Sequence, residues 1–149
     1  MSVDTHRLVY RSRLIPAESP AAMRAMIEAI LAASRRNNAR VGVTGALMFS
    51  AGGFAQVLEG PRAAVEHVFE RIQQDPRHDD VAVLSFGPVG GRAFDQWSMA
   101  YVGMVEVHAD RYASLAAATG YDPSRMTGDA VFGMLEQLVR EEESAAPGP

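Results

Sequence analysis

Two polar side chains lie where the hydrophobic pattern predicts a buried sheet face. Gln56 falls between Phe54 and Leu58 on a segment that reads as a strand, and alternate side chains of a strand share a face. Tyr10 shares its predicted strand face with Leu8. A buried polar group without a partner costs about 1–3 kcal/mol. We therefore expect both side chains to be hydrogen-bonded, although a lone inward tyrosine is often an ordinary core residue.

More polar residues lie near the C-terminal ends of the two predicted helices. Asn37 and Asn38 end the first helix, and Ser34 lies one turn earlier on the same stripe. Arg77 and His78 follow the second helix. Taken singly, the asparagine pair is more typical of a helix C-cap, and Arg77–His78 of a solvated turn. Together, these amides and this guanidinium suit a planar heteroaromatic ligand with an anionic tail.

Other kinds of site are not indicated. The sequence contains no dinucleotide fingerprint, phosphate loop, zinc-protease motif or nucleophile elbow, and its four histidines are scattered. We therefore expect no metal site. The net charge of −4 gives no reason to expect nucleic-acid or membrane binding, and no apolar stretch is long enough for a membrane helix. The absence of cysteine fits a reducing compartment, and we expect a cytoplasmic protein.

The pattern of elements predicts an α+β fold. Strands are expected at residues 6–14, 43–50, 52–60, 81–89 and 97–105, and helices at 20–38 and 61–74. This order is a ferredoxin-like βαββαβ unit with an additional fifth strand, in which two helices cover one face of a mixed sheet. The topology places the first and third strands side by side. Tyr10 and Gln56 would then share the helix-covered face.

The composition changes after residue 106, which divides the chain into a domain at 1–106 and an extension at 107–143. Two C-terminal helices are expected, at 110–119 and 127–142, and the Pro/Gly-rich residues 144–149 are expected to be a disordered tail. The apolar side of the last helix contains Leu135, Leu138 and Val139. It could pack on the open face of the sheet or contact a partner.

At these polar residues the chain resembles the BLUF domain, a family of blue-light sensors that use flavin. The matching segments are LVYRS (8–12), SRRNNAR (34–40), VTGAL (43–47), GFAQVLEG (53–60), DPRH (75–78) and WSM (97–99). They occur in the family order, and the likeness extends from about residue 6 to residue 105. The interval between Tyr10 and Asn38 is a few residues longer than in the family, and the extra length fits the loop at 15–20.

The resemblance implies a cofactor and roles for particular residues. The cofactor would be FAD, with FMN possible. Tyr10 and Gln56 would carry the photochemistry, with Gln56 between the phenol and the flavin. The flavin would be bound by Ser34, Asn37, Asn38, Gln56, Arg77 and His78. Light would drive an electron and a proton from Tyr10 toward the flavin, and Gln56 would rotate or tautomerise. Trp97 and Met99 would relay the change, although the sequence alone makes them ordinary core residues.

The same resemblance implies a photoreceptor rather than an enzyme. Its output would be a changed contact with a downstream protein, or with another copy in a homo-oligomer. One alternative is a ferredoxin-like interaction module without photochemistry. Another is an acylphosphatase-like hydrolase, but the loop at 13–20 lacks the glycines of a phosphate cradle.

Overall fold

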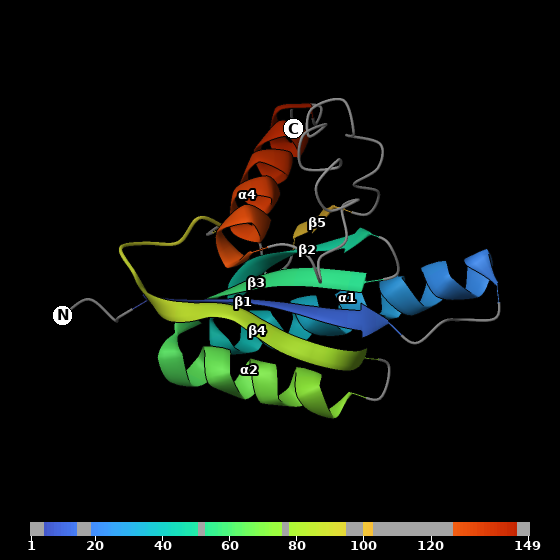
Figure 1. The fold of residues 1–149 in the computed structure, drawn as a ribbon, viewed down its shortest axis with the longest axis horizontal. Helices are drawn as coiled ribbons and strands as arrows, with labels where there is room; N and C mark the ends of the chain where they lie inside the picture. The colour runs from blue at the N-terminus through green and yellow to red at the C-terminus, as the bar shows by residue number, and fades with distance from the viewer. Residues whose placement is uncertain are drawn as a thin grey trace.

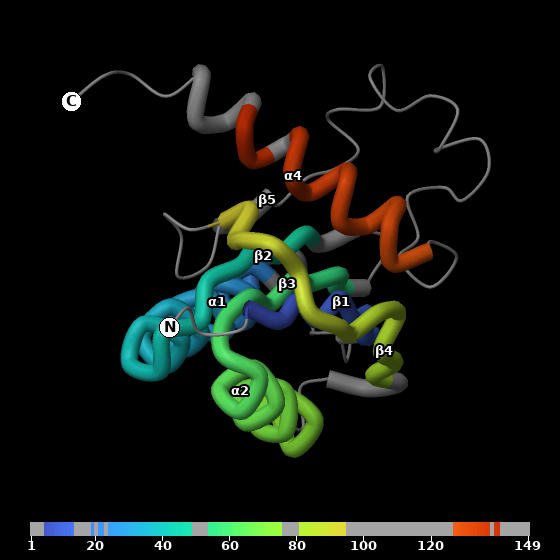
Figure 2. The backbone as a smooth tube through the Cα atoms, turned by 90° about the vertical axis from the view of Figure 1, so that its left-hand side faces the viewer, coloured from blue at the N-terminus to red at the C-terminus, as the bar shows by residue number. Residues whose placement is uncertain are grey.

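The computed structural model describes residues 5–14, 19–50, 53–75, 78–94, 100–102 and 127–145. A single sheet is covered by helices on both faces, with α1 and α2 on one side and α4 on the other (Figures 1 and 2). The elements are β1 (Thr5–Leu14), α1 (Pro20–Val41), β2 (Thr44–Ser50), β3 (Gly53–Pro61), α2 (Arg62–Gln74), β4 (His78–Val89), β5 (Ala100–Val102) and α4 (Gly128–Ala145). Among the described helices, none is long and apolar enough to cross a bilayer.

The sheet confirms the ferredoxin-like prediction. Its strand order is β4-β1-β3-β2-β5, so the first and third strands are adjacent. The first four strands pair antiparallel, and β5 pairs parallel to β2, which makes the sheet mixed. The fifth strand is present at Ala100–Val102. The rest of its predicted range, the predicted helix at 110–119 and residues 146–149 lie outside the described residues.

The strand register brings the two inward polar residues together. Tyr10 of β1 pairs with Gln56 of β3, and Gln56 pairs in turn with Leu47 of β2. The close approach of β2 to β3 depends on Gly45. A Cβ at Gly45 would lie 1.9 Å from the carbonyl oxygen of Val57, so this position has no room for a side chain.

Helix α1 begins and ends with well-defined caps. The Ser19 hydroxyl accepts the N–H of Ala22 at 3.0 Å, and Pro20 opens the first turn. At the other end Gly42 is the C-cap with a φ of 74°, and its N–H bonds the Asn38 carbonyl. The helix therefore ends at Val41 rather than at residue 38. The C-cap interpretation of the asparagine pair is wrong, because both residues lie inside the helix and Gly42 is its C-cap.

Each face of the sheet has its own hydrophobic core. The core beneath α1 and α2 includes Leu8, Phe54 and Leu58, and the core beneath α4 includes Val57. Strand β3 is consequently buried on both faces.

Helix α4 covers the face of the sheet opposite α1 and α2 (Figure 1). Leu135 and Val139 are buried against that face, which confirms the intramolecular alternative for these two residues. Thr127 caps the helix, since its hydroxyl accepts the N–H of Ala130 at 3.1 Å. The helix continues to Ala145, beyond its predicted end at 142.

Candidate functional site

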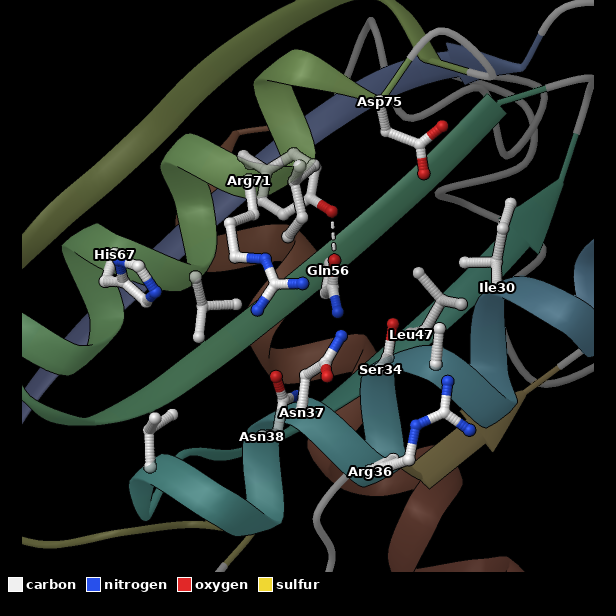
Figure 3. Close-up of a pocket in the computed structure, with 15 residues that line it drawn as sticks. Ile30, Ser34, Arg36, Asn37, Asn38, Leu47, Gln56, His67, Arg71 and Asp75 are labelled. Carbon is white, nitrogen blue, oxygen red and sulfur yellow. Dashed lines mark hydrogen bonds between the residues drawn. The ribbon is translucent and has the colours of Figure 1, made fainter.

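A cavity of about 340 Å³ opens between α1 and α2 above the central strands. Its floor is formed by Tyr10, Leu47 and Gln56 of the sheet. Figure 3 shows Gln56, Asn37 and Ser34 directed into the space between the two helices. The volume lies within the range of about 300–1,000 Å³ that is typical of small-molecule sites.

The floor of the cavity contains a buried hydrogen bond. The Tyr10 hydroxyl donates to Oε1 of Gln56, which answers the expectation that each would find a partner. Both side chains are buried, and the Tyr10 ring packs against Phe69 with ring centroids 5.2 Å apart. With Oε1 directed to the phenol, the Gln56 amide nitrogen points the other way, toward Asn37 (Figure 3). The carboxamide thus presents its acceptor to Tyr10 and its donor to the cavity.

The surroundings keep the Tyr10 phenol protonated. Burial in the protein raises the pKa of Tyr10 far above its ordinary value of 10.0, because the phenolate would lose its hydration. The nearby carboxylate of Asp75 raises the pKa further by repelling a second negative charge. Tyr10 is therefore a neutral hydrogen-bond donor at any ordinary pH.

The α1 wall is polar toward the C-terminal end of the helix, as the sequence predicts. Asn38 has only 1% of its surface exposed, and Ser34 and Asn37 are half-buried on the same wall. Earlier in the helix the wall becomes apolar at Ile30. The α1 wall therefore offers hydrogen-bonding groups at one end and an apolar surface at the other.

The α2 wall contains residues that the sequence analysis missed. His67, Arg71 and Asp75 line the cavity, although the charged pattern of this helix favours a solvated position for His67 and Arg71. Their spacing of four residues follows one edge of the helix, beside the apolar stripe of Val68 and Ile72. That spacing was the available signal. Arg36 of α1, also missed, is a further cavity-lining cation.

The structure does not place every predicted site residue. Ser34, Asn37, Asn38 and Gln56 come together around the cavity. His78 begins β4, but its side chain is not described. The remaining predicted residues, Arg77, Trp97 and Met99, lie outside the described part of the chain.

The cavity suits the ring of a flavin. Ile30, Leu47, Val68 and Ile72 provide apolar contacts for a flat aromatic system. The amides of Asn37, Asn38 and Gln56 provide both donors and acceptors for a polar ring edge. Arg36 and Arg71 provide guanidinium groups for an anionic tail. Among the described residues, no three potential metal ligands cluster.

The fold and the cavity define a ferredoxin-like ligand-binding domain. At the floor of the cavity a neutral tyrosine bonds a carboxamide, beside a site for a planar ring. Residues 5–100 match the family described as sensors of blue-light using FAD, and the chain belongs to this BLUF family. Flavin is accordingly its class of cofactor, and sensing blue light is the function of its domain.

Known proteins with similar sequences or structures support the assignment to the BLUF family. The photo-activated state of BlsA is 26% identical, has a TM-score of 0.78, and matches 97% of this chain and 98% of its own. The dark-state structure of BlrB, a BLUF protein, is 30% identical, has a TM-score of 0.70, and matches 94% of this chain and 98% of its own. Photoactivated adenylate cyclase subunit beta of Euglena longa is 38% identical over 74 residues, which are 49% of this chain. That match spans only 9% of the cyclase subunit.

Proposed function

We propose that this protein is a blue-light photoreceptor whose signal is a rearrangement of the Tyr10–Gln56 hydrogen bond beside a bound flavin. The observation that carries the proposal is the donation from the Tyr10 hydroxyl to Gln56 Oε1 at the floor of the cavity. A carboxamide has one donor end and one acceptor end, so exchanging them changes every bond around it. The pair is therefore suited to act as a two-state element.

The flavin would be bound mainly from α1 and β3. Asn38 and Asn37 are suited to bond the polar edge of the ring, with Ser34 nearby and Gln56 beneath it. We further propose Arg77 and His78 as contacts to the rim of the ring or to its phosphates. FAD is the proposed form, following the family, and FMN is the alternative. Arg36 and Arg71 are suited to bind the phosphates of either form.

Bound in this cavity, a flavin would supply absorption of blue light and an acceptor for one electron. Tyr10 would give up an electron and pass its hydroxyl proton to Gln56 Oε1, the atom to which it is already bonded. Gln56 would then rotate or tautomerise, so that a different end of the amide faces the phenol. When the electron and proton return to Tyr10, the new arrangement of Gln56 persists until it relaxes thermally.

The output of this cycle would be a contact rather than a reaction, so the protein is proposed as a receptor and not an enzyme. We propose residues 1–106 as the flavin-binding domain and 107–143 as a helical extension, with 144–149 as a tail. The signal would reach a downstream protein, or a second copy in a homo-oligomer, in the cytoplasm. Trp97 and Met99 are the proposed relay. They occupy alternate positions with Tyr101, and alternate residues of a strand share a face. Tyr101 pairs with Leu47 in the cavity floor.

The test combines cofactor identification with spectroscopy. The protein is purified in darkness, its flavin is released by heat and separated by chromatography, and intact samples are illuminated with blue light. We expect FAD and a small, reversible red shift of the flavin absorbance. A protein that binds no flavin even after reconstitution would favour the interaction module without photochemistry.

A further inference from the structure

After β4, residues 90–94 form a connection that runs across the sheet below α4 (Figure 2). This connection is hydrogen-bonded to β1, β2 and β3. The Arg7 guanidinium of β1 donates to the Gly91 carbonyl at 3.4 Å, and Arg92 donates to the Thr44 hydroxyl of β2 at 3.2 Å. Glu59 of β3 forms the contact in the middle.

Glu59 holds this connection and β1 at the same time. One carboxylate oxygen, Oε1, accepts the backbone N–H groups of Ala93 and Phe94, each at 2.9 Å. The other, Oε2, is 2.7 Å from Nε of Arg7. The Glu59 side chain is fully buried, whereas Arg7 retains 19% of its side-chain exposure. All the described contacts of this carboxylate lie on the face of the sheet opposite the flavin cavity.

Arg7 and Phe94 extend the network to α4. The Arg7 guanidinium carbon lies 3.9 Å from the centre of the Phe132 ring, which is cation–π geometry. The Phe132 ring also meets the Phe94 ring edge-on, with centroids 6.0 Å apart and an interplanar angle of 84°. Helix α4 therefore rests on two groups whose positions Glu59 sets.

The energetics favour a positioning role for Glu59. A fully buried carboxylate loses its hydration, and replacing a buried ion pair by apolar residues of similar volume is often neutral or stabilising. What an apolar side chain could not do is orient a guanidinium and two backbone N–H groups together. Glu59 thus determines a particular arrangement of strand, connection and helix.

The same two strands are joined by a polar pair on each face. Tyr10 pairs with Gln56 on the cavity face, and Arg7 pairs with Glu59 on the α4 face. We propose that Glu59 is the positioning residue that couples the light-driven change at Gln56 to helix α4. Breaking or remaking the Tyr10–Gln56 bond changes how β1 sits against β3. Arg7 and Glu59 span the same junction, so they transfer that change to Phe132 and to the backbone of residues 93–94.

This inference rests on the proposed photoreceptor function, and the experiment separates the two. The chain contains no cysteine, so two introduced cysteines can carry nitroxide labels. Gly133 of α4 is exposed with open space around it, and Glu28 of α1 is exposed on the opposite side of the sheet. The distance distribution between labels at Gly133→Cys and Glu28→Cys is measured by pulsed electron spin resonance, in darkness and under blue light.

The variant under test is Glu59→Gln, which removes the charge but keeps an acceptor oxygen. Its matched control is Glu136→Gln, which breaks a more exposed ion pair, Glu136–Arg140, on α4 itself. We expect the flavin red shift in the wild type and both variants. The light-dependent change in the distance distribution should be present in the wild type and Glu136→Gln, and lost in Glu59→Gln.

A second variant, Phe132→Leu, keeps the test decisive if Glu59→Gln does not fold. It leaves the bonds of Glu59 in place and removes only the ring that Arg7 and Phe94 contact. We expect it, too, to keep the red shift and lose the movement of α4. A red shift with an unchanged response of α4 in these variants, or with no response in the wild type, would overturn the inference alone. A wild type without any red shift would overturn the proposed function, and this inference with it.

Discussion

Replacing Tyr10 with phenylalanine removes one hydroxyl and leaves the ring that packs against Phe69. The variant should still bind flavin, because Asn37, Asn38 and Gln56 remain around the cavity. It should not form the red-shifted state, because Gln56 Oε1 loses the group that donates to it in the dark. Removing the hydroxyl therefore separates cofactor binding from photochemistry.

The cost in stability follows from the burial of the bond. Tyr10 is fully buried and Gln56 is 3% exposed, so the variant leaves a buried acceptor without its donor. The loss is about 1–3 kcal/mol in the free energy of unfolding. For a chain of this length, about 2 kcal/mol lowers the melting temperature by roughly 4–8 °C.

The pH dependence gives a second measurement of the same variant. The folded pKa of Tyr10 is raised above 10.0, mainly by burial and then by Asp75. Near pH 10 this tyrosine ionises only in the unfolded chain. The contribution of the Tyr10 hydroxyl to the free energy of unfolding is therefore fully present below pH 10 and is lost as the pH rises above 10. The stability advantage of the wild type over Tyr10→Phe should narrow above pH 10 by about 1.4 kcal/mol per pH unit.

The assays are thermal unfolding followed by circular dichroism between pH 7 and pH 11, and absorbance spectra before and after blue light. Variant and wild type are compared at equal flavin loading. A normal, reversible red shift in Tyr10→Phe would refute the role given to the phenol. Equal melting temperatures at pH 7 would refute the burial argument.

Three further predictions concern other parts of the site and its frame. Asp75→Asn removes one cause of the raised pKa of Tyr10, so this pKa should fall but stay above 10.0. The carboxylate of Asp75 also favours loss of an electron from the phenol, because it is a nearby negative charge. Transient absorption should therefore show a lower yield of the red-shifted state in this variant. Gly45→Ala forces a Cβ to within 1.9 Å of a neighbouring carbonyl oxygen, and since strands would have to separate, denaturant titration should show a loss of at least about 3 kcal/mol or no folded protein. Arg71→Gln should weaken flavin binding several-fold in fluorescence titrations with a smaller dependence on salt, whereas the exposed Arg62→Gln on the same helix should leave both unchanged.

Much of the fold was predictable because its hydrophobic patterns are simple. The alternation around Gln56 and the helical stripe ending at Asn38 specify which faces are buried. The strand order then follows from the βαββαβ arrangement, and it brings Tyr10 beside Gln56. Local sequence signals predict the presence of a helix or strand better than they predict its first and last residues. The end of α1 is fixed by the positive φ of Gly42, which two preceding asparagines obscured as a cap signal.

The parts of the site that could not be predicted depend on tertiary contacts. His67 and Arg71 are exposed on α2, and only the placement of α1 opposite them makes a cavity wall. Glu59 lies on the face of β3 opposite Gln56, and its sequence pattern predicts no role for it. Glu59 is buried because α4 and the connection at residues 90–94 cover that face. The hydrophobic alternation within β3 does not predict this burial.

The central claim is that light rearranges a tyrosine–glutamine pair beside a flavin, and the most direct measurement is the absorbance spectrum of the purified protein, first in darkness and then under blue light. The account predicts a flavin spectrum that moves slightly to the red and returns in darkness. A flavin spectrum that stays fixed, or that bleaches without returning, would contradict it.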